Sequence, residues 1–246
     1  MNNEEIIMRE SEYFGYVNIY TDTSDRIINI NDNEIRITAP GFIVTYNSRI
    51  IFQLIYIYVD AYTIFGEMKA IDMALDWINY MQSIGNRFKY NIFCDNNPVT
   101  IILNKGLIKN ETNKSDSPTK ILGNIIVDKI KKSNALITIY YVPGHIPVNN
   151  GFGFSKHKKK FFEFNSVYHN NLKYVLNDQM IFEAATYNNV IDMTTRNYLF
   201  QNMNYIIQDL YNMDLSLILR NKNNPSIWPF QQKYDYNDNF FLPNSF

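Results

Sequence analysis

Three carboxylates and one histidine stand where predicted strands or helices begin or end. Asp22 closes the alternating stretch YVNIYTD, Glu67 opens the helix-like stretch GEMKAIDMALDWI, and Asp95 closes YNIFCD. His145 follows the apolar run LITIYYV, in a Pro-Gly-His sequence. Clustered carboxylates repel one another and are normally held together by divalent cations such as Mg²⁺ or Mn²⁺. If these acids meet, two such ions would suit hydrolysis of a phosphodiester.

Each acid taken singly is better explained as a residue that faces water at the end of its element.

The composition adds a second restraint on function. The formal net charge is -1, so no global basic field indicates a nucleic-acid-binding protein, and any such binding must come from local patches. The hydrophobic content of 46% and the aromatic content of 15% indicate a folded globular chain.

The cysteine content, the N-terminal stretch and the length of the apolar runs predict the cellular setting. The single cysteine, Cys94, excludes an intrachain disulfide and a cysteine-based zinc site, and its apolar surroundings predict a small buried strand residue. The acidic start MNNEEIIMRE has no apolar core of a signal peptide. The longest apolar run, 50–59, is about half as long as a membrane-spanning helix. We therefore expect an intracellular protein of a reducing compartment, with no membrane partner.

Periodicity predicts the elements that must position the four residues. Three β-rich runs come first, and the later two, after Pro40-Gly41, are divided by the turn signal Asn47-Ser48, which predicts an antiparallel meander. The stretch 25–34, rich in Asp and Asn, is predicted to be a loop. A helix from Gly66 that ends by Gly85 would place Glu67 in its first turn, where the helix dipole favours a carboxylate.

The remaining elements alternate between strand and helix. The patterns predict a strand at 90–95, a helix from 96–98 onward and a polar loop at 109–119. They then predict a helix at 121–132, a strand at 136–142 and a late helical stripe at 203–217. An antiparallel start followed by helix-linked strands is typical of a mixed sheet with helices packed on it.

Four short stretches, in this order, carry a resemblance to a known family. YTDTS, GEMKAI, FCDNN and YYVPGH resemble the type 1 ribonuclease H signatures that read TDGS, AELxAI, TDS and VPGH. The match covers roughly 16–154. It implies an α/β fold, a ribonuclease H-like mixed five-stranded sheet flanked by helices, over residues 16–160. A lead-in at 1–15 and a helical and irregular C-terminal extension at 161–246 complete the expected organisation.

The resemblance also implies roles for single residues. Asp22 would bridge two Mg²⁺ or Mn²⁺ ions, Glu67 and Asp95 would hold the ions, and His145 would assist water attack or product release. Asn97, two positions after the third acid, occupies a place that often contacts the nucleic acid.

The family pattern continues from VPGH to GNExAD, whose Asp is a fourth metal ligand. Ser155 occupies that position here, and the stretch GFGFSKH has no carboxylate. A serine hydroxyl is a poor ligand for a hard dication, so one ion would be held less tightly. The nearest later acid is Glu163, which a shifted helix would bring in. Asp192 and Asp209 are interpreted as acids on the solvated face of a later helix.

A basic cluster follows the histidine, formed by Lys156, Lys158, Lys159 and Lys160. These lysines would hold a phosphate backbone through counterion release, or they would be one solvated helix face.

Two functions remain open at this point. The first is a metal-dependent endonuclease that cuts the RNA strand of an RNA–DNA hybrid, weakened by the missing fourth carboxylate. The alternative is a catalytically inactive ribonuclease H-like module that binds RNA–DNA hybrids or structured RNA, or serves as a structural part of a larger assembly. In either case the aromatic, proline-punctuated extension is expected to dock on a protein partner.

Overall fold

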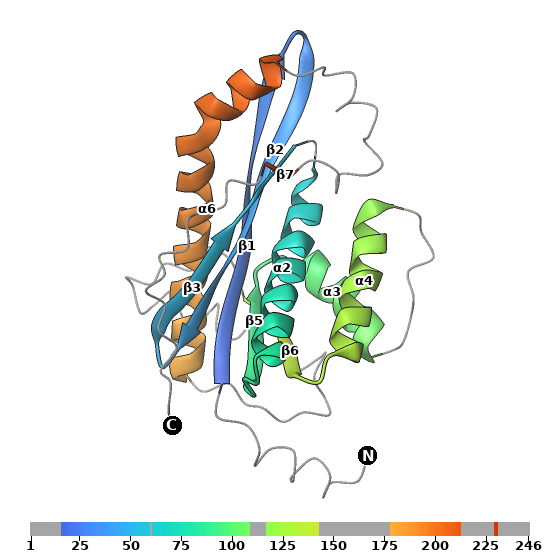
Figure 1. Cartoon of the computed structure of the whole chain (residues 1–246), viewed down its shortest axis with the longest axis vertical. Helices are drawn as coiled ribbons and strands as arrows, with labels where there is room; N and C mark the ends of the chain where they lie inside the picture. The colour runs from blue at the N-terminus through green and yellow to red at the C-terminus, as the bar shows by residue number, and fades with distance from the viewer. Residues whose placement is uncertain (1–15, 60, 109–116, 143–177, 213–228, 231–246) are drawn as a thin grey trace, which may run out of the picture.

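The computed structural model describes residues 16–59, 61–108, 117–142, 178–212 and 229–230 (Figure 1). Its strands are β1 Tyr16–Ile30, β2 Asn33–Tyr46, β3 Arg49–Ile55, β4 Ile57–Val59, β5 Lys89–Cys94, β6 Leu136–Tyr141 and β7 Pro229–Phe230. Its helices are α2 Thr63–Ser83, α3 Asn97–Ile108, α4 Pro118–Lys132 and α6 Asp178–Asn212. None of the helices in these ranges has both the length and the apolar character that crossing a membrane requires.

The strands form one mixed sheet with β1 near its centre. The order is β6-β5-β1-β2-β4-β7, and β3 pairs with a later stretch of the same edge of β2 that β4 pairs with. The pairs β1–β2 and β2–β3 are antiparallel, whereas β1–β5 and β5–β6 are parallel. The antiparallel meander and the later helix-linked strands predicted from the sequence are therefore confirmed, and these later strands pair in parallel.

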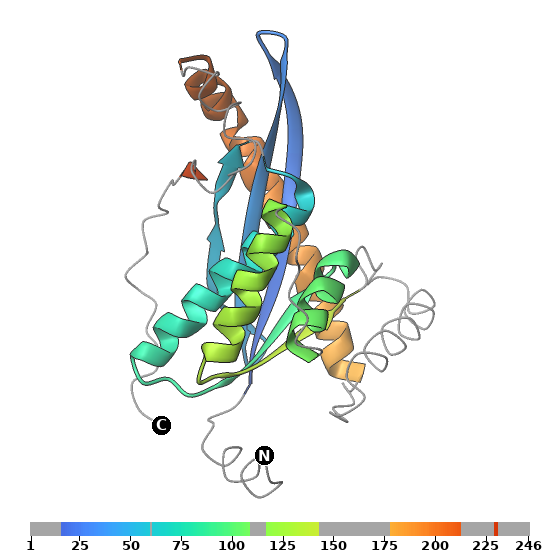
Figure 2. The same cartoon turned by 90° about the vertical axis from the view of Figure 1, so that its right-hand side faces the viewer.

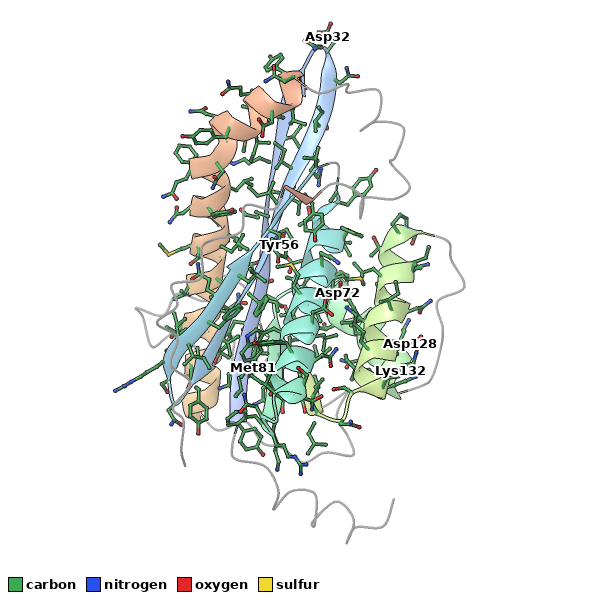
Figure 3. The ribbon with its side chains drawn as sticks, viewed as in Figure 1. Asp32, Tyr56, Asp72, Met81, Asp128 and Lys132 are labelled. Carbon is green, nitrogen blue, oxygen red and sulfur yellow. The ribbon has the colours of Figure 1, made fainter. Side chains whose placement is uncertain are left out.

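The first hairpin is longer than the sequence pattern suggests, and the loop predicted at 25–34 is wrong. β1 runs on to Ile30, which pairs with Asn33, so the turn is only Asn31 and Asp32. Both turn residues have positive φ, 49° and 62°. Asn and Asp tolerate this left-handed conformation better than other non-glycine residues, so the polar stretch forms a tight hairpin turn. Figure 3 shows Asp32 at the far end of the hairpin.

Helices cover both faces of the sheet. α2, α3 and α4 lie on one face, and the long α6 crosses the other (Figure 1). Successive residues of β1 point to opposite faces. Val17 and Ile19 join the core under α2, whereas Tyr20 joins a separate core with Ala184 and Ile191 of α6.

α6 extends along the hairpin well beyond the parallel strands, as Figure 2 shows from the side. Its later turns pack on the hairpin through Tyr198, Leu199, Ile206 and Leu210. The partners on the hairpin include Ile35 and Ile37, which are fully buried. The predicted helical stripe from 203 is confirmed as far as 212, where the described part of α6 ends.

A buried ion-pair cluster joins α2 to α4. The Asp72 side chain, which Figure 3 shows between these helices, is 5% exposed and contacts Nζ of Lys69 at 2.6 Å and Nζ of Lys129. Burial by itself would raise the pKa of Asp72, but the hydrogen bonds from both lysines lower it below its usual value. Asp72 is therefore a structural residue that holds α4 against α2.

Candidate metal centre

Asp22, Glu67 and Asp95 come together at the end of β5. Carboxylate oxygens of the three residues all lie within 4.8 Å of one another. The last β1–β5 pair is Thr21 with Cys94, so Asp22 is the first β1 residue beyond that strand and Asp95 is the first residue after it. Because β5 ends there, side chains from helices on both faces can reach Asp22. The juxtaposition predicted from the sequence is present in the structure.

The cluster is electrostatically costly without a cation. Asp22 and Glu67 are 5% and 4% exposed, and Asp95 is partly buried. Burial, followed by the charge of Asp95, raises the pKa of Asp22 well above its usual value. Burial, followed by the charge of Asp22, does the same to the pKa of Glu67. The backbone N–H of Thr23 donates to Asp22 Oδ1 at 2.7 Å and partly offsets this effect.

Glu67 reaches the site because α2 passes very close to the sheet. A Cβ atom on the preceding residue, Gly66, would lie 2.4 Å from Thr38 Cγ2 and 2.6 Å from Thr23 Oγ1. Only glycine fits at this distance, so the absence of a side chain at Gly66 allows α2 to pass this close to the sheet beside Glu67. The prediction that Glu67 lies in the first turn of its helix is wrong, because α2 begins at Thr63 and has no acid in its first turn.

A second glycine allows α6 to approach from the opposite face. Gly41 of β2 is the residue paired with Asp22, and a Cβ atom on it would lie 2.9 Å from Thr195 Cγ2 of α6. Thr195 is fully buried. Since Asp192 is almost one helical turn before Thr195, this contact brings Asp192 toward the carboxylate cluster.

Asp192 is a fourth acid beside the three. Its charge contributes to the raised pKa values of both Asp22 and Glu67, after the larger effects named above. Its side chain is only 18% exposed, and both of its oxygens contact Arg196 Nη2 at 2.9 Å. The interpretation of Asp192 as an acid on a solvated face is therefore wrong, because that face of α6 lies against the site. Asp209, by contrast, is exposed as expected.

Asn188 lies one turn before Asp192 on the same helix and contacts the third acid. Its Nδ2 donates to Asp95 Oδ2 at 3.4 Å. The residue is 2% exposed, and its Oδ1 has no hydrogen-bond partner among the described residues. α6 thus reaches the carboxylate cluster through two polar side chains.

Two further predicted residues lie beside the acids. Cys94 is fully buried, as predicted, and burial followed by the Glu67 charge raises the pKa of its thiol well above the usual value. Asn97 begins α3 and is partly buried, and its Oδ1 is without a hydrogen-bond partner in the part of the chain described. Its contact with nucleic acid stays a prediction.

Several residues named from the sequence lie outside the described residues. They are His145, Ser155, Glu163 and the basic cluster of Lys156, Lys158, Lys159 and Lys160. Their predicted roles stay predictions.

A short pattern in the sequence points to Asp192, but it lies too far along the chain to be found from the expected motif spacing. In GNExAD an Asn precedes the Asp by four residues, and the stretch NNVID has the same relation between Asn188 and Asp192. It occurs far later in the chain than a motif following VPGH should. Residues four apart share one face of a helix, so both can reach one site once α6 packs on the sheet.

No family model matches this sequence, and no curated protein matches it. Solved structures are similar to parts of it. LC11-RNase H1 in complex with an RNA/DNA hybrid is 12% identical with a TM-score of 0.41, covering 60% of this chain and 98% of that one. The foamy viral protease-reverse transcriptase in complex with dsDNA is 18% identical with a TM-score of 0.41, covering 62% and 96%.

A third similar structure is the N-terminal ribonuclease H domain of a Mycobacterium tuberculosis protein, fused to maltose binding protein. It is 13% identical with a TM-score of 0.38, covering 62% of this chain and 97% of that one. Ribonucleases H are thus among the solved structures that this chain resembles, and the mixed sheet flanked by helices that its motifs predict is the fold observed.

Proposed function

We propose that this chain is a divalent-metal-dependent endonuclease that cleaves the RNA strand of RNA–DNA hybrids. The observation that carries the proposal is the cluster of Asp22, Glu67 and Asp95, whose carboxylate oxygens lie within 4.8 Å of one another. Hard oxygen ligands at such spacing suit Mg²⁺ or Mn²⁺. The choice of a hybrid as substrate rests on the four ribonuclease H-like motifs.

The residues present fit a cation. Glu67 Oε2 is buried and has no hydrogen-bond partner within the described ranges. A buried anionic oxygen without a donor is costly, and a cation would compensate it. Two divalent ions, when bound, would supply the charge that activates a water molecule and stabilises the leaving oxygen.

Each acid has a distinct part in this proposal. Asp22 would bridge the two ions, and Glu67 and Asp95 would hold them from α2 and from the end of β5. Asp192 would complete the set in the place that the family pattern gives to the Asp of GNExAD. His145 would assist proton transfer, and Asn97 and the four lysines of the 156–160 cluster would hold the hybrid.

The alternative of an inactive binding module was supported by the missing fourth acid, by the near-neutral net charge and by the C-terminal extension. In this proposal Asp192, whose charge acts on both Asp22 and Glu67, would take the place of the missing acid, so the first of these reasons loses weight. The catalytic proposal therefore no longer requires a three-carboxylate enzyme.

The test is cleavage of a labelled RNA–DNA hybrid by the full chain in Mg²⁺ and in Mn²⁺. We expect cleavage to vanish in Asp22→Asn, and to fall about tenfold to a hundredfold in Asp192→Asn. Asp209→Asn is the matched control, because this acid is exposed on the same helix, and it should cleave at the wild-type rate. Folded wild-type protein that cleaves in neither metal would refute the catalytic proposal and favour the binding module.

A further inference from the structure

Asn188 has a contact pattern that a purely structural side chain would not be expected to have. It is 2% exposed and lies on the face of α6 that packs against the sheet, with Ala184, Ile191 and Thr195. Its Nδ2 donates to Asp95 Oδ2 at 3.4 Å, so half of the amide is directed at the carboxylate cluster. Its Oδ1 is buried and has no partner among the residues that the structure describes.

The orientation of the amide follows from its neighbours. A flipped amide would place Oδ1 against the Asp95 carboxylate, so that two acceptors would face each other. The donor must therefore face Asp95, and this leaves Oδ1 without a hydrogen. Buried side-chain oxygens nearly always have a donor, so an unsatisfied one at such a position indicates a missing ligand or water.

Asn188 is not the only unsatisfied acceptor here. Glu67 Oε2, in the cluster that includes Asp95, is also buried without a partner among described residues. One unsatisfied oxygen thus belongs to an acid of the cluster, Glu67 on α2, and the other belongs to Asn188 on α6, whose amide contacts the acid Asp95. Hydrated divalent cations present both positive charge and water hydrogens, which would satisfy the carboxylate and the amide respectively.

We propose that Asn188 is a positioning residue of the metal centre, which orients the Asp95 carboxylate through Nδ2 and accepts a hydrogen bond from cation-bound water through Oδ1. This inference rests on the proposed function. Being neutral, Asn188 adds an oxygen acceptor without adding to the mutual repulsion of the acids. Residues that orient metal ligands in this way affect metal affinity strongly although they do not touch the ion.

Asn188→Leu in the full chain separates this role from a packing role. Leucine has a similar volume and removes both the donor and the unsatisfied oxygen. We expect the dissociation constant for Mn²⁺, measured by calorimetry or by electron paramagnetic resonance, to rise about tenfold or more. The melting temperature in EDTA should change little, because the variant loses only the long 3.4 Å hydrogen bond to Asp95 and also removes the buried unsatisfied Oδ1. Asn188→Ala provides a second variant, since alanine is accommodated in any helix.

Asn197→Leu is the matched control, because Asn197 is exposed on the same helix. Its Mn²⁺ affinity should equal that of the wild type. Unchanged Mn²⁺ affinity in both Asn188 variants, with a wild type that binds the ion, would overturn the role of Asn188 and leave the proposed function standing. Wild-type protein that binds no Mn²⁺ would overturn both proposals.

Discussion

At the scale of single residues, Asp22 and Glu67 share a burial that opposes their ionisation. Desolvation is the largest cause of the raised pKa in each, and the neighbouring acids add to it. In the metal-free protein these groups retain protons at pH values where ordinary carboxyl groups have lost them. Divalent cations and protons should therefore compete for the same oxygens.

The first prediction concerns stability against pH. A carboxyl group whose folded pKa is raised binds more protons in the folded state than in the unfolded one, so the free energy of unfolding falls as pH rises. We expect the melting temperature of the metal-free protein to fall as the pH rises above the usual carboxyl pKa of about 4. Saturating Mg²⁺ should remove the trend. The pKa of Asp72 is lowered, so this residue makes the free energy of unfolding rise with pH, but only at pH values below its usual carboxyl pKa.

The double variant Asp22→Asn, Glu67→Gln is the control for this measurement, because it cannot ionise at either position. Its melting temperature should vary little over the same range. A wild-type melting temperature in EDTA that is constant, or that rises with pH, would contradict the assignment of protonated acids to the site.

The second prediction concerns Arg196. This residue is 54% exposed and contacts both oxygens of Asp192, and its charge lowers the pKa of Asp22 against the larger opposing effects. Its positive charge should therefore compete with a bound cation. We expect Arg196→Met to lower the dissociation constant for Mn²⁺ about twofold to fivefold. This factor corresponds to the free energy that partly exposed ion pairs usually contribute. Arg196→Lys keeps the charge and should bind Mn²⁺ as the wild type does, and weaker binding by the Met variant would refute this account.

At the scale of elements, the site depends on two close approaches of helix to sheet. α2 passes over Thr23 and Thr38 at Gly66, and α6 passes over Gly41 at Thr195. The first contact is at the residue before Glu67, and the second is at the residue that pairs with Asp22. The helices therefore carry their acids to the site through contacts that any larger side chain would disturb.

The third prediction compares two helical glycines. Alanine at Gly66 would gain about 1 kcal/mol of helix propensity, but its Cβ would overlap Thr38 and Thr23. We expect Gly66→Ala to lower the free energy of unfolding by about 1–3 kcal/mol, as overpacking does, and to weaken Mn²⁺ binding. Denaturant titration and calorimetry measure the two effects.

Gly123→Ala in α4 is the matched control, since its Cβ would come no nearer than 3.1 Å, to Ile102 Cγ2. This variant should keep the wild-type Mn²⁺ affinity. Equal metal binding by Gly66→Ala and Gly123→Ala would show that the approach of α2 does not position Glu67.

At the scale of the whole molecule, α6 forms the second layer on the sheet. Its buried residues share one core with Tyr20 and Phe93 and another with Ile35 and Ile37 of the hairpin. The same helix carries Asn188 and Asp192. Packing on this face of the sheet and two polar side chains near the acids therefore come from one element, which the sequence alone assigned to an extension beyond residue 160.

The fourth prediction follows from this arrangement. A chain that ends at residue 160 lacks α6 and would expose the apolar face that α6 covers. We expect it to aggregate, or to bind a hydrophobic dye and lose its near-ultraviolet circular dichroism. Cooperative melting of the truncated chain at the full-length temperature would instead support residues 16–160 as an independently folding domain.

The sequence by itself determined the three clustered acids, most of the helices and strands, and the mixed character of the sheet. These features are local, because Asp22 lies in a strand recognisable by alternation, Asp95 directly follows a short apolar strand, and Glu67 lies in a helix recognisable by its period. The long hairpin was missed because Asn31 and Asp32 resemble loop residues although their positive φ angles form a two-residue turn.

Only the tertiary structure decided that Asn188 contacts Asp95 and that the charge of Asp192 acts on Asp22 and Glu67. Asp192 is far from the other acids in sequence, and on its own helix it resembles any acid on a solvated face. Its place beside Asp22 depends on a contact between Thr195 and Gly41 across the sheet, which neither residue type predicts. Helical periodicity indicates which residues share a face, but which surface that face meets depends on the packing of the whole chain.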